Sequence, residues 1–185
     1  MTNKNMPSKE YIEECLDYNP NTGVFTWKFR PRYHFKNEGA FKMWNRRYSN
    51  QECGRIKENS SGKRYRTIML DGKPKYAHRL AWFIFKGDID DSMQIDHING
   101  DGLDNRIENL RQVTAAENSK NLRLSKRNTS GFSGVRFCNS YRKWEARIGK
   151  ENLGYFKSYE DAVSARIKAE ADRGYHKNHG SKRPL

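Results

Sequence analysis

Long apolar runs are missing from this sequence of 185 residues. No stretch approaches the ~18 consecutive apolar residues of a membrane span, and no apolar leader follows Met1. We therefore expect neither a membrane helix nor a secretory signal, and predict a protein that stays in the cytoplasm without a membrane partner.

Cysteine is also scarce. Cys15, Cys53 and Cys138 are odd in number and far apart, and no C-x-x-C pair occurs. This usage favours reduced thiols over disulfides and predicts no structural zinc site.

Positive charge, by contrast, is abundant: the net charge is +14. Residues 1–76 hold 16 Lys and Arg against 8 acids, residues 77–124 hold 6 against 8, and residues 125–185 hold 14 against 6. The excess predicts a polyanionic partner. Basic ends around an acidic centre favour ends that bind phosphates and a centre that holds a cation.

The acidic centre contains the most informative stretch, residues 93–123. Residues 93–97 read as a strand that ends in Asp96-His97, and residues 109–113 read as a return strand. Thr114 and Glu117 form the T-x-x-E pattern of a capping box, which predicts a helix with Asn118 in its first turn. Asp96, His97 and Asn118 can then converge where a hairpin meets a helix, the layout of a ββα-metal nuclease site.

Phosphodiester hydrolysis needs these residue types. An imidazole such as His97 can act as the general base near neutral pH. A carboxylate and an amide oxygen, from Asp96 and Asn118, suit a hard cation such as Mg²⁺. Strand alternation points His97 away from the face of Asp96, so a further side chain, Asn109, is needed to brace the loop.

At these residues the sequence resembles the HNH endonucleases, in the phage and intron-associated branch whose motif ends in Asn. The resemblance extends from A-H-R-L-A-W at Ala77 through I-D-H-I-N-G-D to E-N-L-R-Q-V-T and A-x-x-N. It implies a general base at His97, a loop-bracing Asn109, and one divalent metal ion, Mg²⁺ or alternatively Mn²⁺, at Asp96 and Asn118. Two alternatives stay open: Asn121 for Asn118, and Asn105 for Asn109.

A calcium loop is a rival interpretation. The run from His97 through Asn99 and Asp101 to Glu108 mimics the ligand spacing of an EF-hand. However, its first position is not Asp, and we expect strands rather than helices on either side. The nuclease interpretation is therefore preferred.

The N-terminal section predicts a basic helix and hairpin region. A helix is expected over residues 8–18, and strands over 24–29, 65–70 and 75–77, the last two joined at Asp71-Gly72. Residues 30–50 are basic and aromatic, which suits either DNA contact or a long loop packed by its own aromatics. Residues 78–85 read as a helix, in which no role can be derived for His78 or Arg79.

The C-terminal section predicts a separate module after a polar stretch, residues 122–130. Strands are expected over residues 133–138, 143–148 and 152–156, followed by a helix over 158–172. Trp144, Ala146 and Ile148 share one face of the second strand, and an alanine stripe at Ala162, Ala165 and Ala169 lets the helix pack closely on it. The opposite face is then open and basic.

That module resembles the Apetala-type, or ethylene-response-factor, DNA-binding domain, through S-G-V-R, K-W-E-A-R-I and L-G-Y-F. The resemblance implies that the sheet lies in the major groove and that Arg136, Lys143 and Lys150 contact DNA. Strand alternation and turn position add Arg142 and Arg147. The alternative is a sheet and helix module that binds protein or nothing.

Together these patterns predict an α+β protein: a basic region over 1–76, a ββα-metal nuclease core over 77–124, a linker over 125–130, and a DNA-binding module with a three-stranded antiparallel sheet plus helix over 131–185. The predicted function is a site-directed, homing-type DNA endonuclease of a phage or mobile element, acting as a monomer on double-stranded DNA. The alternatives are a non-catalytic DNA-binding regulator and a restriction or packaging nuclease.

Overall fold

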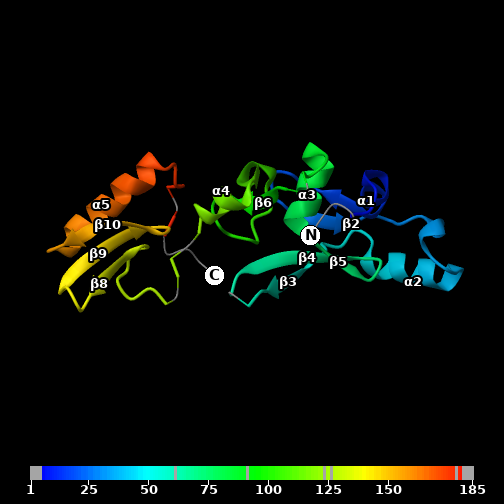
Figure 1. Cartoon of the computed structure of the whole chain (residues 1–185). Helices are drawn as coiled ribbons and strands as arrows, with labels where there is room; N and C mark the ends of the chain where they lie inside the picture. Colours follow the sequence, from blue (N-terminus) through cyan, green and yellow to red (C-terminus); the bar gives the residue numbers. More distant parts are fainter. Residues whose placement is uncertain are drawn as a thin grey trace. The chain divides into compact units, whose positions relative to one another are not determined.

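The computed structural model describes residues 6–60, 62–90, 92–122, 124–125, 127–177 and 179–180. The chain divides into two compact units, one running to Thr114 and the other beginning at Ala115. Each unit has its own hydrophobic core. Figure 1 labels the helices and strands of both units. Among the described residues, no helix is both long and apolar enough to cross a bilayer.

The elements of the first unit are α1 (Lys9–Cys15), β1 (Leu16–Tyr18), β2 (Phe25–Trp27), the 3-10 helix η2 (Arg32–His34), α2 (Glu38–Tyr48), β3 (Arg55–Glu58), β4 (Arg64–Leu70), β5 (Lys73–Tyr76), α3 (Ala77–Lys86), β6 (Gln94–His97), the 3-10 helix η3 (Ile107–Asn109) and β7 (Leu110–Val113). Those of the second unit are α4 (Ala115–Ser119), β8 (Val135–Cys138), β9 (Lys143–Ile148), β10 (Glu151–Phe156) and α5 (Tyr159–Asp172).

Helix α1 is shorter than the sequence predicts. Ser8 caps its start, with Oγ accepting a hydrogen bond from the backbone N of Tyr11 at 3.3 Å. The helix expected to reach residue 18 ends at Cys15, because Leu16 is extended and begins β1, which pairs antiparallel with β2. This pairing leaves Leu16 and Phe25 2% and 0% exposed, so burial of apolar surface overrides the helical spacing here.

Helix α2 lies in the segment where the sequence suggests a basic, aromatic loop. Asn37 caps its first turn. On the inner face, the ring of Trp44 packs edge-on against Trp27, with centroids 5.1 Å apart. Asn45 is buried, and its side chain both accepts from the backbone N of Arg30 at 2.8 Å and donates to the Arg30 carbonyl at 2.9 Å. Trp44 therefore serves packing, as the loop alternative expected of the aromatic residues, but on a helix.

Arg30, the first residue of that segment, is buried rather than exposed on the surface. Its side chain forms an ion pair with Asp71 at 3.0 Å and lies over the rings of Tyr11, Phe35 and Trp44. A charge held in this way between aromatic faces and a carboxylate is a structural element. It does not contribute to a DNA-binding surface.

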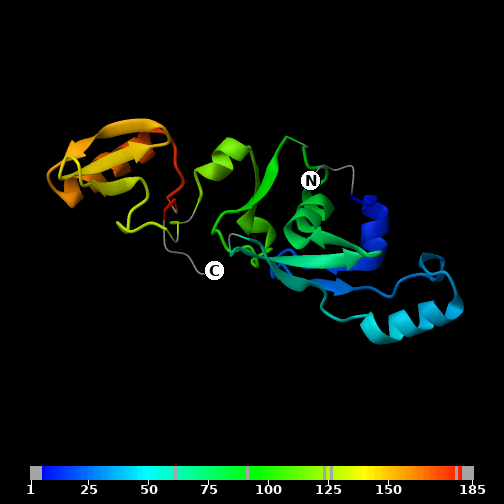
Figure 2. The same cartoon turned by 60° about the horizontal axis from the view of Figure 1, so that its bottom comes forward.

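Strands β3, β4 and β5 form an antiparallel sheet with β4 at its centre. The predicted hairpin at Asp71-Gly72 is confirmed: Leu70 pairs with Lys73, and both turn residues have positive φ, 47° and 75°, as a type I′ turn requires. Strand β3 was not predicted, because all four of its residues are exposed and give no alternation. Figure 2 shows β3 and β4 side by side and α2 projecting at the end of this unit.

Helix α3, predicted at residues 78–85, packs on α1, β4 and β6. Its Leu80 and Ala81 share one core with Ile12, Ile68 and Ile95. The predicted domain border between residues 76 and 77 falls inside this core. The predicted basic region and the first part of the predicted nuclease core therefore fold as one unit, since neither buries its apolar side chains alone.

In the second unit, β8, β9 and β10 form an antiparallel sheet in the order β10-β9-β8, and α5 lies against it. This confirms the sheet and helix that the sequence predicts. Ser158 caps α5, with Oγ accepting from the backbone N of Asp161 at 3.0 Å. Ala162 of the helix packs with Val135 and Ala146 of the sheet in a small core.

Two buried charges in this unit depart from the predicted pattern. The alanine stripe of α5 is interrupted by Arg166, which is 3% exposed and donates to the carbonyl of Arg147 at 2.9 Å while pairing with Glu170 at 2.9 Å. Glu145, expected on an open basic face, is also 3% exposed. Burial of these two groups depends on ionic partners that the alternation of β9 and α5 does not reveal.

The predicted linker is a hydrogen-bonded part of the second unit. Ser130 Oγ donates to the Val135 carbonyl at 2.6 Å, and the backbone N of Gly180 donates to the Leu122 carbonyl at 2.8 Å. Residue 126 lies outside the described residues. The described part of this segment therefore belongs to the module instead of separating it from the preceding chain.

Candidate active site at the end of strand β6

Asp96 and His97 are the last two residues of β6, opposite Arg111 and Leu110 of β7. Alternation along the strand turns their side chains to opposite faces. His97 faces the interior and is 4% exposed, whereas the side chain of Asp96 is 12% exposed. The strand therefore places a buried imidazole and a carboxylate side by side in sequence and on different faces.

The His97 ring lies in a polar and aromatic pocket inside the first unit. Its Nε2 is 3.3 Å from Oδ1 of Asn105, which is 1% exposed. The ring of His78, from α3, packs edge-on with centroids 4.9 Å apart, and Tyr65 of β4 lies at 6.2 Å. These contacts hold the ring from two sides.

Burial sets the charge of both histidines. It lowers the pKa of His97, and although the contact with Asn105 and the nearby carboxylates, Asp96 first among them, favour the charged form, they do not cancel that effect. Burial lowers the pKa of His78 further, with the neighbouring His97 adding to it. Both rings are therefore neutral at neutral pH, the state in which a histidine can accept a proton.

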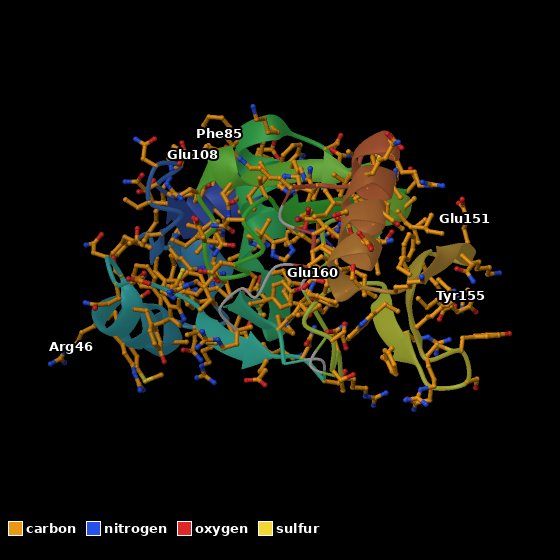
Figure 3. All side chains as sticks on the ribbon, turned by 90° about the vertical axis from the view of Figure 1, so that its left-hand side faces the viewer. Arg46, Phe85, Glu108, Glu151, Tyr155 and Glu160 are labelled. Carbon is orange, nitrogen blue, oxygen red and sulfur yellow. The ribbon has the colours of Figure 1, made fainter. Side chains whose placement is uncertain are left out.

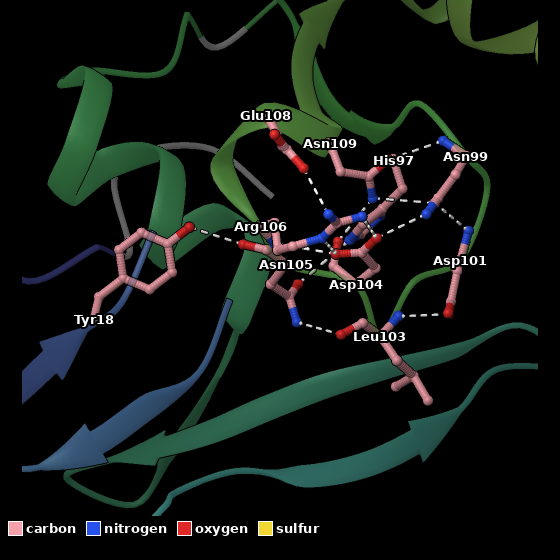
Figure 4. A network of polar contacts seen from close by, with 10 residues as sticks. All are labelled: Tyr18, His97, Asn99, Asp101, Leu103, Asp104, Asn105, Arg106, Glu108 and Asn109. Atoms are coloured by element: carbon pink, nitrogen blue, oxygen red, sulfur yellow. Dashed lines mark hydrogen bonds and ion pairs between the residues drawn. The ribbon is translucent and has the colours of Figure 1, made fainter. Parts of the chain in front are cut away.

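The loop from residue 98 to 109 is braced by Asn109 (Figure 4). Oδ1 of Asn109 accepts from the backbone N of Asn99 at 3.0 Å. Its Nδ2 donates to Asn99 Oδ1 at 3.0 Å and to the Asp104 carbonyl at 2.8 Å. The Asn109 carbonyl accepts from the backbone N of Ile98 at 2.8 Å. One side chain thus ties the two ends of the loop directly behind His97.

The acidic side chains of this loop are held by a guanidinium. Arg106 contacts Asp104 Oδ2 at 2.8 Å and Glu108 Oε1 at 2.6 Å. The bond from Arg106 holds the pKa of Asp104 below its usual range. With strands on both sides and Arg106 on these carboxylates, the loop does not have the arrangement of an EF-hand. Within the described ranges, no group of three or more His, Cys, Asp or Glu side chains gathers as a metal cluster.

Asp96 has an ionic partner across the hairpin. Arg111 reaches its Oδ2 with Nη2 at 2.9 Å and with Nε at 3.1 Å. Both contacts go to the same carboxylate oxygen. Arg111 therefore balances the charge of Asp96 without engaging Oδ1.

Comparison with known proteins identifies this region. Residues 75–120, which include β6, the braced loop and β7, match the family described as HNH endonuclease. This stretch of the chain is similar to an HNH endonuclease domain. An uncharacterized HNH endonuclease of Acanthamoeba polyphaga mimivirus is 47% identical over 51 residues, which cover 26% of this chain and 13% of that protein. Protein 3.8 of Escherichia phage T7 is 34% identical over 74 residues, which cover 40% of this chain and 61% of that protein.

The chain thus spans less than two thirds of the length of either relative. No solved structure matches. The matched residues run past Thr114 and so include the first residues of the second unit.

The structure brings together three of the four residues predicted for the HNH site: Asp96, His97 and Asn109 lie on one hairpin of the first unit. Asn118 is half-buried on α4, and Asn121, the alternative, is 5% exposed just after it. Both belong to the second unit, so the metal role of Asn118 stays a prediction.

Sequence reasoning missed three neighbours of the site. Arg111 pairs with Asp96, Asn105 contacts His97 directly, and His78 packs on the same ring. Two signals were visible in the sequence: the motif that starts at Ala77, and Asn105 as the alternative to Asn109. Neither could reveal a contact, because α3 and the loop meet only through the fold.

The residues predicted to bind DNA in the C-terminal module are all exposed: Arg136, Arg142, Lys143, Arg147 and Lys150. Arg136 and Arg147 both pair with Glu145, the second at 3.8 Å. The outer face of this sheet is therefore basic at its edge and carries a buried carboxylate at its centre. Arg142 occupies the turn between β8 and β9 with a φ of 48°.

Proposed function

We propose that this protein is a metal-dependent DNA endonuclease that hydrolyses phosphodiester bonds with His97 as the general base. The observation that carries the proposal is the buried His97 imidazole, whose pKa is lowered by burial, next in sequence to Asp96 and at the start of a loop braced by Asn109, within the residues that match the HNH family. HNH nucleases generally use a divalent metal ion. An imidazole that can accept a proton and a divalent cation are the two groups that activation of water requires.

The metal ligands of this proposal are Asp96 and Asn118. A carboxylate and an amide oxygen are hard donors that fit Mg²⁺, with Mn²⁺ as the alternative. A bound divalent ion supplies charge neutralisation at the phosphoryl group and the leaving 3′ oxygen.

The chain's own residues then have distinct tasks. His97 takes a proton from the attacking water. Asn109 keeps the loop, and with it the ring, in place. Arg111 pairs with the Asp96 carboxylate across the hairpin.

Double-stranded DNA is the proposed partner, and the C-terminal module is its proposed reader. The support is the exposure of Arg136, Arg142, Lys143, Arg147 and Lys150 on one sheet, together with the resemblance to Apetala-type domains. Because Glu145 neutralises part of this face, we assign phosphate contacts first to Arg142, Lys143 and Lys150.

Helix α2 offers a second basic surface, its outer face. Lys42, Arg46 and Arg47 are exposed there, and the sole acid of the helix, Glu38, already pairs with Lys42 and Arg32. Figure 3 shows Arg46 reaching away from the ribbon. Since α2 projects from the unit that holds His97, contacts along it extend the bound DNA beyond the cleavage position (Figure 2).

Such an extended site suits a homing-type enzyme that acts as a monomer in the cytoplasm of a host cell. The runner-up is a DNA-binding regulator without catalysis, which the presence of Asp96, His97, Asn109 and Asn118 together disfavours. A restriction or packaging nuclease is the third candidate, and the genes beside this one distinguish it from a homing enzyme.

The decisive experiment incubates plasmid and host DNA with the full chain in Mg²⁺ or in EDTA. We expect cleavage with Mg²⁺, none with EDTA, and none with Asp96→Ala. Binding without cleavage in Mg²⁺ and in Mn²⁺ would instead establish the regulator.

A further inference from the structure

The side chain of Asn105 contacts the His97 ring through a polar atom, and its orientation is set from its other end. Asn105 Nδ2 donates to the carbonyl of Leu103 at 3.0 Å. A carbonyl oxygen can only accept, so the atom on that side must be the amide nitrogen. The atom that faces His97 Nε2 at 3.3 Å is therefore Oδ1.

This orientation places the proton of the imidazole. Oδ1 of Asn105 can only accept, so His97 Nε2 must carry the hydrogen. In a neutral imidazole the other nitrogen then has the lone pair. Both side chains are at least 96% buried, so water does not compete freely for this contact.

The backbone of Asn105 is fixed by the β1–β2 hairpin of the same unit. The hydroxyl of Tyr18 donates to the Asn105 carbonyl at 2.8 Å, and the carbonyl of Pro20 accepts from Ile107 at 3.0 Å. Gly23 approaches so closely that a Cβ there would lie 2.5 Å from the carbonyl carbon of Asn105. A hairpin some 80 residues away in sequence thus holds the residue that contacts the ring.

We propose that Asn105 is a positioning residue that holds the His97 ring with a hydrogen on Nε2, so that Nδ1 is the nitrogen that accepts the proton of water. The second clause rests on the proposed endonuclease function, whereas the first does not. The edge-on contact of His78 restricts rotation of the same ring and so acts with Asn105.

The first test is spectroscopic and needs no DNA. The full chain, labelled with ¹⁵N-histidine, is examined by long-range ¹H–¹⁵N correlation at about pH 7.5, where an ordinary histidine is neutral, and the His97 signals are assigned by their loss in His97→Ala. We expect one tautomer, with an Nε2-bound hydrogen that exchanges slowly with water. A hydrogen on Nδ1, or a rapidly exchanging mixture, would overturn the proposal.

The second test compares two variants of neighbouring residues. Asn105→Leu removes the acceptor, and we expect a mixture of tautomers and a kcat lower by roughly 2- to 10-fold or more, the effect of losing one neutral hydrogen bond, with KM little changed. The matched control, Glu108→Leu, removes one exposed ion pair of the loop without touching the ring, and should keep the single tautomer and a kcat within about twofold. Equal effects of the two variants would show that Asn105 only supports the loop.

The two proposals fail separately. If Asn105→Leu does not fold, the wild-type spectrum still decides the tautomer. If the wild-type chain shows the expected tautomer but cleaves no DNA, the endonuclease function fails and the positioning of His97 stands.

Discussion

Replacement of His78 by Phe should make the first unit less sensitive to acid. His78 is 8% exposed, packs on His97 and Tyr76, and has a pKa well below its ordinary value of 6.5 because burial disfavours its charged form. His97 has a lowered pKa for the same reason. Below pH 6.5 the unfolded chain therefore binds more protons at these two positions than the folded chain does.

The sign and size of the change in unfolding free energy with pH follow from this difference in bound protons. Where the unfolded state binds more protons than the folded state, the free energy of unfolding rises with pH. The stability that depends on the uncharged histidines is therefore fully present above pH 6.5 and is lost as pH falls. Each such histidine contributes a slope of up to ~1.4 kcal/mol per pH unit. Two of them lower the stability by up to ~2.7 kcal/mol per unit, a large share of the 5–15 kcal/mol typical of a domain. His78→Phe keeps the ring and removes about half of this slope.

Urea unfolding between about pH 5 and 6.5, in EDTA, measures the slope of the free energy of unfolding against pH. This range is chosen because the ordinary pKa values of the carboxyl groups lie lower. In a Trp144→Phe background, tryptophan fluorescence reports the first unit alone, through Trp27, Trp44 and Trp82. Slopes are compared, since the substitution also changes the stability at every pH. Identical slopes with and without His78 would refute the reasoning that burial keeps this imidazole neutral.

Four further predictions concern DNA. His97→Ala should bind DNA like the wild type but cleave it ~10²-fold more slowly or worse, the usual contribution of a general base; cleavage within a few-fold of wild type would remove His97 from the mechanism. Asn118→Ala should abolish cleavage more fully than Asn121→Ala, and the reverse ranking would move the metal ligand to Asn121. Joint replacement of Lys42, Arg46 and Arg47 by Ala should lower the slope of log K against log salt by up to ~2.7. A control that removes Lys9, Lys73 and Lys86, exposed elsewhere on the same unit, should lower it clearly less, and equal losses would mean that α2 is not a DNA surface. Joint replacement of Arg142 and Lys143 by Ala should shorten the nuclease footprint on one side of the cleavage position, and an unchanged footprint would argue against a DNA-binding C-terminal sheet.

Local patterns alone determined much of this protein. The alternation of apolar and polar residues predicted β9 and its neighbours, because each strand needs one face for its own core. Asp71-Gly72 predicted a tight hairpin, because its turn requires positive φ at both positions. Asp96 and His97 were identified from their chemistry at the end of a short apolar strand. All of these signals lie within a few residues of each other in the chain.

Only the tertiary structure decided which polar groups are buried and what they touch. Arg30 and Glu145 read as surface charges, yet ionic and aromatic partners distant in sequence allow both to be buried. Leu16, predicted in a helix, lies in β1 because pairing with β2 buries more apolar surface. Asn105 gained its contact with His97 only because Tyr18, on that first hairpin, holds it from behind. Such outcomes depend on the sum of long-range contacts, which no local pattern of residue types encodes.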